Sequence, residues 1–229
     1  MDFLSTKGIE YLLSLSYLLL LIPFWWLLRR VTNERIPVAA TDTTENRYGG
    51  FTVPEGLHFH RGHTWVEPEG DGLYRVGIDD FARCLLGRPS SVSLPAAGDS
   101  LQQGRKGWSL EVDGREVDML SPLPGQVAEV NPALERSPGL VAEDPFGDGW
   151  LMKVRAEPLS LTNLLPARLV RPWMEDTSQR LSALSGGELG PVMQDGGVPV
   201  FGFARQLAGD AWPEIAAELL LTVGEPPRE

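Results

Sequence analysis

The sequence predicts a mainly β domain with short helices, preceded by an apolar N-terminal segment and followed by a helical extension. Asp113-Gly114 separates two runs of alternating polarity, a pattern typical of a β-hairpin with a two-residue turn. The uncharged stretch from Tyr11 to Leu28 would span about 27 Å as a helix, which approaches the thickness of a bilayer core. Beyond Val170, apolar residues recur at spacings of three and four, which indicates amphipathic helices.

The hairpin around Asp113-Gly114 is the feature around which the rest of the domain is organised. Its first arm is expected to end at Val112 and its second to begin at Arg115. Asp113 and Gly114 therefore form the tip. The Ser-Pro and Pro-Gly pairs within residues 121–125 are turn signals and close the unit.

Segment 111–122 resembles the lipoate-bearing hairpin of the glycine cleavage system H protein, whose pattern is E-S-V-K-A-x-S-D-x-x-S-P. Counted back from the Ser-Pro pair, Asp118 falls on the Asp of that family and Glu111 on its Glu. The lipoyl-lysine of the family falls on Gly114, and glycine has no amine to acylate. The resemblance therefore implies a chain without a lipoyl group, and no other cofactor is expected.

The resemblance continues through residues 57–166, in segments that keep the family's order and spacing. The matching segments are 63–66 for H-E-W-V, 77–87 for G-I-T-D-x-A-Q-x-x-L-G, 92–98 for V-x-L-P-x-x-G, 125–131 for G-E-V-x-E-V-N and the long run 144–154. They imply the barrel-sandwich hybrid of lipoyl and H-protein domains. An Asp at 79 or 80 is expected to cap the short helix that ends near Gly87.

Two further departures concern the cleft that shelters the loaded arm in H proteins. The family's acid after the strand histidine is Thr64 here, and the histidine that many relatives carry after G-I-T-D is Phe81. Both changes remove polar groups that would hold an aminomethyl cargo. They agree with the loss of the lysine at Gly114.

Residues 1–30 are predicted to form a transmembrane anchor. The residues expected to define it are Tyr11, Tyr17, Trp25, Trp26, Arg29 and Arg30. A cleaved signal peptide is the alternative, but its charged region should precede the apolar run, and here the arginines follow it. The positive-inside rule then places the N-terminus outside and the main domain in the cytoplasm, on a single-pass protein of the bacterial inner membrane.

The remaining divisions are a polar linker at 31–56, the H-protein-like domain at 57–166 and an extension at 167–229. The extension is expected to hold two short helices. Pro172 would start the first helix, with Trp173 on its apolar face. Asp210 would cap the second, with Trp212 on its apolar face. Whether these helices pack on the domain or on a partner is left open by the sequence.

Composition and motifs exclude several classes of function. The net charge of −11 argues against nucleic-acid binding, and the single Cys84 excludes an internal disulfide and a cysteine-based metal site. His58, His60 and His63 raise the alternative of a metal site, but a bend at Gly62 separates His63 from the other two. Hydrogen-bonded strand histidines, with no metal, are the favoured interpretation. No catalytic motif is present, so the chain is not expected to be an enzyme.

The sequence thus predicts a membrane-anchored, non-lipoylated structural subunit that binds other subunits of a membrane complex. The residues expected to contribute to that interaction are Asp113, Gly114, Arg115, Trp173 and Trp212. In layout the chain is analogous to the H subunit of purple-bacterial reaction centres, which suggests an accessory role in a bioenergetic or photosynthetic complex. The alternative is a divergent lipoyl or acyl carrier of a glycine-cleavage-like system, acting through Lys106 or through a partner.

Overall fold

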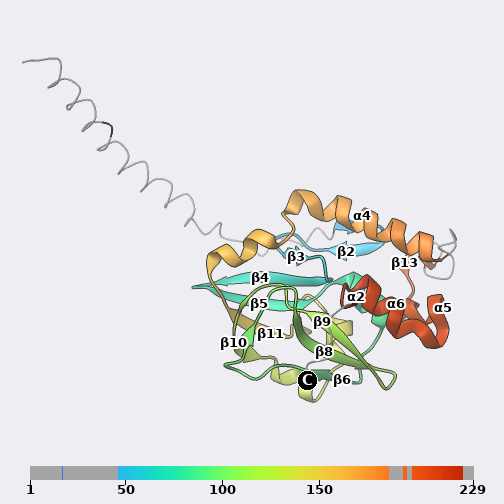
Figure 1. Cartoon of the computed structure of the whole chain (residues 1–229), viewed down its shortest axis with the longest axis horizontal. Coiled ribbons are helices and arrows are strands. Elements are labelled where there is room, and N and C mark those ends of the chain that lie inside the picture. Colours follow the sequence, from blue (N-terminus) through green and yellow to red (C-terminus); the bar gives the residue numbers. More distant parts are fainter. Residues whose placement is uncertain (1–16, 18–45, 186–192, 195–197, 224–229) are drawn as a thin grey trace, which may run out of the picture. The chain divides into compact units, whose positions relative to one another are not determined.

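A computed structural model describes residues 17, 46–185, 193–194 and 198–223 (Figure 1). The chain from Thr44 to Glu229 forms one compact unit. Of the predicted anchor only Tyr17 is described, and its side chain is exposed. Tyr11, Trp25, Trp26, Arg29 and Arg30 lie outside the described residues. Among the helices that the structure does describe, none has the length and hydropathy needed to cross a bilayer.

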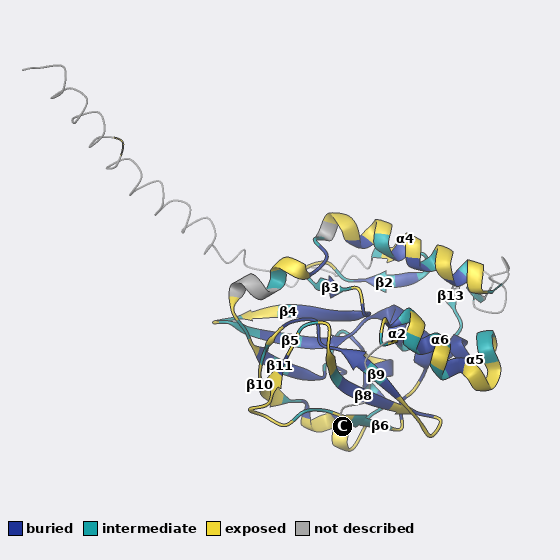
Figure 2. Ribbon diagram, in the orientation of Figure 1, coloured by how far each residue is buried: buried dark blue, intermediate teal, exposed yellow. Residues whose placement is uncertain are grey.

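Two antiparallel sheets build the domain, and their apolar faces meet in its core (Figures 1 and 2). The larger sheet has the order β3 (His58–His60), β4 (Thr64–Gly70), β5 (Leu73–Ile78), β11 (Met152–Arg155), β10 (Gly125–Val130) and β7 (Ser100–Leu101). The smaller sheet has the order β6 (Ser91–Ser93), β8 (Lys106–Val112) and β9 (Arg115–Leu120). Trp65, Val76, Trp108 and Met119 are among the buried side chains that fill the core.

Short helices connect these strands, as predicted for a mainly β domain. They are α2 (Asp80–Leu86), the 3-10 segment η1 (Pro132–Glu135), α3 (Leu140–Glu143) and the 3-10 segment η2 (Pro158–Asn163). Asp79 caps α2 by accepting a hydrogen bond from the Ala82 N–H at 2.9 Å, and Gly87 ends the helix with a φ of 86°. The predicted cap and end of this helix are therefore confirmed.

The predicted hairpin is also confirmed. Val112 pairs with Arg115, so Asp113 and Gly114 alone form the turn. Their φ angles are 52° and 72°, and positive values at both positions are what a two-residue turn of this kind requires. Glycine adopts this backbone without strain and aspartate tolerates it, which explains why this dipeptide turns the chain here.

The prediction of a linker reaching residue 56 is wrong for its last part. Strands β1 (Asn46–Tyr48) and β2 (Phe51–Val53) form a hairpin that packs on the domain. The Phe51 side chain is fully buried, and the Thr52 N–H donates to the Asp80 carboxylate at 2.7 Å. Gly49 and Gly50 make the turn of this hairpin.

The described part of the C-terminal extension contains three helices, whereas two were predicted. They are α4 (Ala167–Leu184), α5 (Phe203–Ala208) and α6 (Trp212–Leu219), with a small hairpin of β12 (Met193–Gln194) and β13 (Val198–Pro199) and the 3-10 turn η3 (Gly209–Ala211) between them. Helix α4 begins at Ala167 and includes Pro172, so the predicted start at Pro172 is wrong. Pro172 follows the first turn and removes one N–H that would bond within the helix, which α4 tolerates.

Asp210 does not cap α6. It lies in η3, and no side chain caps the N-terminus of α6. Pro213 stands instead in the first turn of that helix, where a missing N–H loses no hydrogen bond. The sequence left open whether the helices of the extension pack on the domain or on a partner. In the structure α5 lies against α2 and α6 lies against β9, so both pack on the domain (Figure 1).

Candidate functional site

The hairpin tip is the position at which the family would carry its lysine. Asp113, Gly114 and Arg115 are all exposed. No atom lies within 4 Å of the place where a Cβ at Gly114 would stand, so a side chain there would project into solvent. The geometry thus presents this position openly, but the residue that occupies it offers no amine.

Arg205 of α5 binds this tip and was not singled out from the sequence. Its Nε donates to the Asp113 carboxylate, and its Nη1 donates to the Leu86 carbonyl oxygen at 3.0 Å. Its guanidinium carbon lies 5.0 Å from the centre of the Trp212 ring, within cation–π range. One side chain therefore joins the hairpin tip, the end of α2 and α6. Trp212 is 5% exposed and packs within the fold, so it offers little surface to a partner.

Aromatic side chains pack around Phe81, one of the two cleft positions. Phe81 is fully buried and lies 5.0 Å from Phe51 and 5.7 Å from Phe203, measured between ring centres. Thr64 is also fully buried, and its hydroxyl has no hydrogen-bond partner in the structure. Phe51 comes from β2 and Phe203 from α5, so segments on both sides of the family core contribute. The result is an apolar cluster where the resemblance implied a polar cleft.

His63 lies next to this cluster and is held from two directions. Its Nδ1 lies 2.8 Å from the Asp79 carboxylate, which accepts the hydrogen bond. Its ring stacks on Phe81 at 4.1 Å and on Trp173 at 4.9 Å. The backbone φ of His63 is 59°, an uncommon value for a residue other than glycine. His63 and Asp79 are both almost completely buried, so this pair links β4, α2 and α4 within the interior.

The other histidines do not join His63 in a metal site. His58 and His60 share one side of β3, while Phe59 between them is buried. The Gly62 N–H donates to His60 Nδ1 at 3.0 Å, and burial lowers the pKa of His60 to about 4. Burial also lowers the pKa of His58. Within the described residues, no group of three His, Cys, Asp or Glu side chains could hold a metal ion.

Neither the thiol nor the lysine nearest the hairpin tip is placed as a reactive nucleophile. Burial, with a contribution from Asp80, raises the pKa of the Cys84 thiol to about 12. Lys106 stands at the base of the hairpin, opposite Leu120, and forms ion pairs with Asp118 at 2.6 Å and Glu116 at 3.1 Å. The Asp118 hydrogen bond is the main cause of the raised pKa of Lys106. A protonated amine is a poor acceptor for an acyl group.

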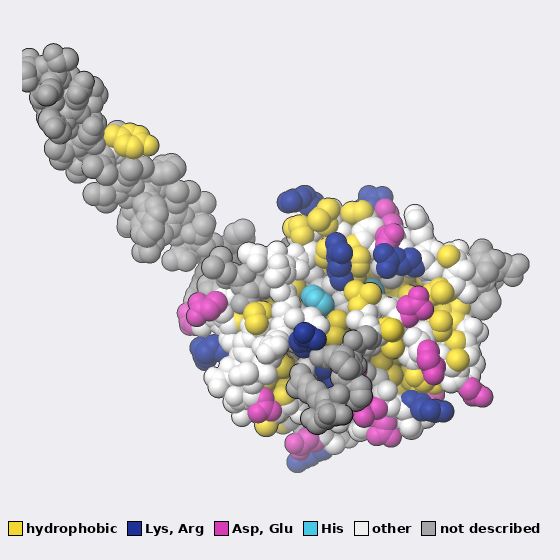
Figure 3. Space-filling model, in the orientation of Figure 1, with side chains coloured by type: hydrophobic (Ala, Val, Ile, Leu, Met, Phe, Trp, Pro, Cys, Tyr) yellow, Lys and Arg dark blue, Asp and Glu magenta, His cyan; other side chains and the backbone are white. Residues whose placement is uncertain are grey.

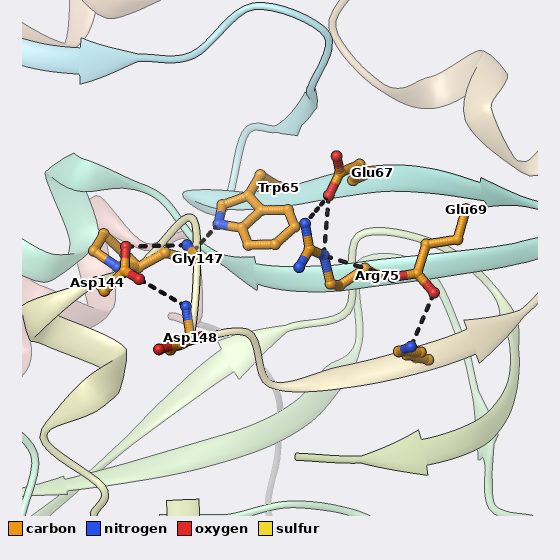
Figure 4. Close-up of polar contacts among 9 residues, drawn as sticks. Trp65, Glu67, Glu69, Arg75, Asp144, Gly147 and Asp148 are labelled. Atoms are coloured by element: carbon orange, nitrogen blue, oxygen red, sulfur yellow. Dashed lines mark hydrogen bonds and ion pairs between the residues drawn. The ribbon is translucent and has the colours of Figure 1, made fainter. Parts of the chain in front are cut away.

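The carboxylate of Asp144 has a structural role in segment 144–154 (Figure 4). The Asp144 carboxylate accepts hydrogen bonds from the Gly147 N–H at 3.1 Å and the Asp148 N–H at 2.7 Å. The Trp65 indole N–H donates to the Pro145 carbonyl oxygen at 3.1 Å, which ties this turn to β4. These contacts explain the longest family-like run in the sequence as a folded turn rather than as catalytic groups.

Known proteins similar to this chain include members of one family. The family model "Glycine cleavage H-protein" matches residues 57–175. The glycine cleavage system H protein of Alteromonas mediterranea is 44% identical over 105 residues, which are 46% of this chain and 81% of the relative. The H protein of Bacteroides fragilis is 41% identical over 118 residues, which are 51% of this chain and 93% of the relative. The crystal structure of an H protein from Mycobacterium marinum is 33% identical, covers 51% of this chain and 94% of that one, and superposes with a TM-score of 0.46.

Members of this family are carrier proteins, so the prediction that the chain is not an enzyme is confirmed. The family match favours the carrier alternative, because the members of the family are carriers. It gives no support to the role of a structural subunit. It also does not bear on the predicted membrane anchor, because the matched residues begin at residue 57. What it does establish is that the chain belongs to the glycine cleavage H-protein family.

Proposed function

We propose that this chain is a non-lipoylated H-protein-family module that acts by binding other proteins rather than by carrying a lipoyl group. The observation that carries this proposal is the hairpin tip. Gly114 occupies the position of the attachment lysine, and the neighbouring Asp113 is bound by Arg205 of the extension. A carrier needs an acceptor amine at this tip and an arm that moves freely to other enzymes. Both requirements are unmet at this position.

The filled cleft supports the same proposal independently of the tip. Phe203 is fully buried against Phe81, at one of the two positions where H proteins hold polar groups around the loaded arm. A polar cargo placed there would have to displace a buried aromatic side chain. The extension that supplies Phe203 also supplies Arg205, so a single added segment closes the cleft and binds the tip.

A lipoylation assay tests the proposal. The full chain and the Alteromonas mediterranea H protein are each co-expressed with a lipoate ligase, and intact-mass spectrometry records any added lipoyl group. We expect the relative to gain the modification and this chain to remain unmodified, because none of its lysines stands at the hairpin tip. A lipoyl mass on this chain in a substantial fraction of molecules would contradict the proposal.

A divergent carrier is the second candidate, and membership of a carrier family favours it. Its most accessible acceptor in the described hairpin is Lys106, since the side chain is 42% exposed. In the same assay a Lys106→Arg variant identifies the acceptor. A modification that disappears in this variant would support the carrier function through Lys106. The ion pairs of Lys106 with Asp118 and Glu116 argue against it, because they hold the amine in its protonated form.

We further propose that residues 1–30 anchor the protein in the bacterial inner membrane, with the folded unit in the cytoplasm among the subunits of a membrane complex. The apolar run between Tyr11 and Leu28 and the arginines after it support this placement. We expect the full chain to fractionate with membranes and to resist alkaline carbonate, and a chain that begins at residue 44 to fractionate with soluble proteins. Recovery of the full-length chain in the soluble fraction would contradict the anchor.

A further inference from the structure

A groove lies between α4 and α6, and both helices contribute residues to its lining. Its volume is about 680 Å³. Residues of α4 from Leu169 to Leu184 line it on one side, and Glu218 and Leu219 of α6 line it on the other. His63 lies at its base. Because Asp79 and Trp173 hold His63 in place, the base of the groove is formed before any ligand binds.

The groove is long. The lining residues of α4 run from Leu169 through Trp173 and Arg180 to Leu184, at the spacings of three and four that mark one helix face. Fifteen residue steps at the helical rise make this face about 22 Å long. A small ligand would cover only part of that length, whereas a helix of about four turns matches it.

Exposed apolar side chains are concentrated along the groove. Leu169, Leu184 and Leu221 are 44%, 41% and 46% exposed, and all three line it. In the space-filling view, hydrophobic side chains alternate with Lys and Arg side chains on the upper part of the domain, where α4 lies (Figure 3). Large exposed apolar side chains gathered in one place are typical of a surface that binds a partner.

The charges on the rim define the partner further. The Arg180 Nε lies 3.0 Å from the Asp176 carboxylate, so the charges of these two residues neutralise each other. Arg61 and Glu218 also line the groove, and neither has an ion-pair partner in the described part of the chain. A ligand that carries only negative charge, such as an anionic lipid headgroup or a carboxylate, would attract Arg61 but repel Glu218. A peptide with one acidic and one basic residue beside its apolar face satisfies both.

We propose that the groove between α4 and α6 binds an amphipathic helix of a partner protein. Leucine-like side chains of that helix occupy the groove between Leu169 and Leu184. An acidic residue faces Arg61 and a basic residue faces Glu218, which fixes the direction of the helix. This inference rests on the proposed protein-binding function and names the surface through which that function is exerted.

Selection from a library of amphipathic helices tests the inference. The full chain in lipid nanodiscs is presented with displayed peptides about four turns long, which have apolar residues on one face and random charged residues on the other. Empty nanodiscs remove peptides that bind lipid. We expect the selection to enrich peptides that bind the groove. Their affinity should be about tenfold lower or more for the variants Leu169→Glu and Leu184→Glu, because each change places a charge in the apolar contact.

Phe201→Glu is the matched control, since Phe201 is 50% exposed and does not line the groove. The affinity of this variant for the selected peptides should stay within about twofold of the affinity of the unaltered chain. Exchanging Arg61 and Glu218, as Arg61→Glu with Glu218→Arg, should favour peptides with the two charges exchanged. A proline at the centre of the peptide should abolish binding.

The inference would be overturned by selection of no peptide, by equal loss of affinity in Leu184→Glu and Phe201→Glu, or by dimerisation of the chain that Leu184→Glu abolishes. Binding of phosphatidylglycerol vesicles that is lost in Leu169→Glu would also overturn it, in favour of a lipid surface. The lipoylation assay reports separately on the proposed function, because an added lipoyl group leaves the peptide measurements unchanged.

Discussion

Replacing Phe203 by alanine is expected to lower the free energy of unfolding by about 3–5 kcal/mol, as for other fully buried aromatic residues. Phe203 lies outside the residues that the family model matches, yet its side chain has no exposed surface. Its ring contacts those of Phe51 and Phe81, with centre-to-centre distances of 6.4 and 5.7 Å. Truncation would leave a cavity among these rings. Chemical denaturation followed by tryptophan fluorescence measures the change.

Phe201→Ala provides the control for this experiment. Phe201 lies in the same segment of the chain but is 50% exposed, so its replacement should change the unfolding free energy by less than about 0.5 kcal/mol. If Phe203→Ala were equally neutral, the extension would not be part of the folded core. The proposal that it closes the cleft would then lose its structural basis.

Replacing Asp79 by alanine is expected to lower the free energy of unfolding by a similar amount, about 3–5 kcal/mol. The change removes the cap of α2, because the Ala82 N–H loses its acceptor. It also leaves the buried His63 Nδ1 without its partner, and an unsatisfied buried polar group is the more costly of the two losses. Thermal and chemical unfolding of the purified variant measure the change.

Two comparisons separate these contributions. Asp79→Asn keeps an oxygen that can cap α2, so it should recover part of the lost stability. Asp99→Ala also removes a carboxylate that accepts a backbone N–H, from Ala96 at 2.8 Å, but at an exposed site without a buried partner. The free energy of unfolding is expected to fall by about 1 kcal/mol in Asp99→Ala. Equal losses in Asp79→Ala and Asp99→Ala would show that the contact with His63 contributes little.

These two buried contacts show how the C-terminal extension is joined to the β domain. The His63–Asp79 pair joins the family strand β4 to the cap of α2 and supports Trp173 of α4. Phe203 and Arg205 then bring the extension onto α2 and the hairpin tip. The added segment is thus integrated into the domain through α2 and the hairpin tip. This arrangement supports the proposed function in protein binding.

The sequence by itself determined the parts of the structure that depend on near neighbours. The Asp113-Gly114 turn, the Asp79 cap and the pairing of β8 with β9 each follow from the chemistry of a few adjacent residues. Ordered matches to the H-protein pattern extended these local predictions to the whole β domain. The resemblance likewise placed Gly114 at the lysine position of the family. This was visible in the sequence, because the absence of an amine does not depend on folding.

Only the tertiary structure decided which distant segments meet. Arg205 binds Asp113 across 92 positions of the chain, and no local pattern distinguishes that arginine from its exposed neighbours. Phe51 and Phe203 flank the family core in sequence, and packing alone brings them to Phe81. The groove between α4 and α6 exists only once both helices are docked. The physical reason is that short-range propensities act along the chain, whereas burial and ion pairing act through space and can join any residues that the fold brings together.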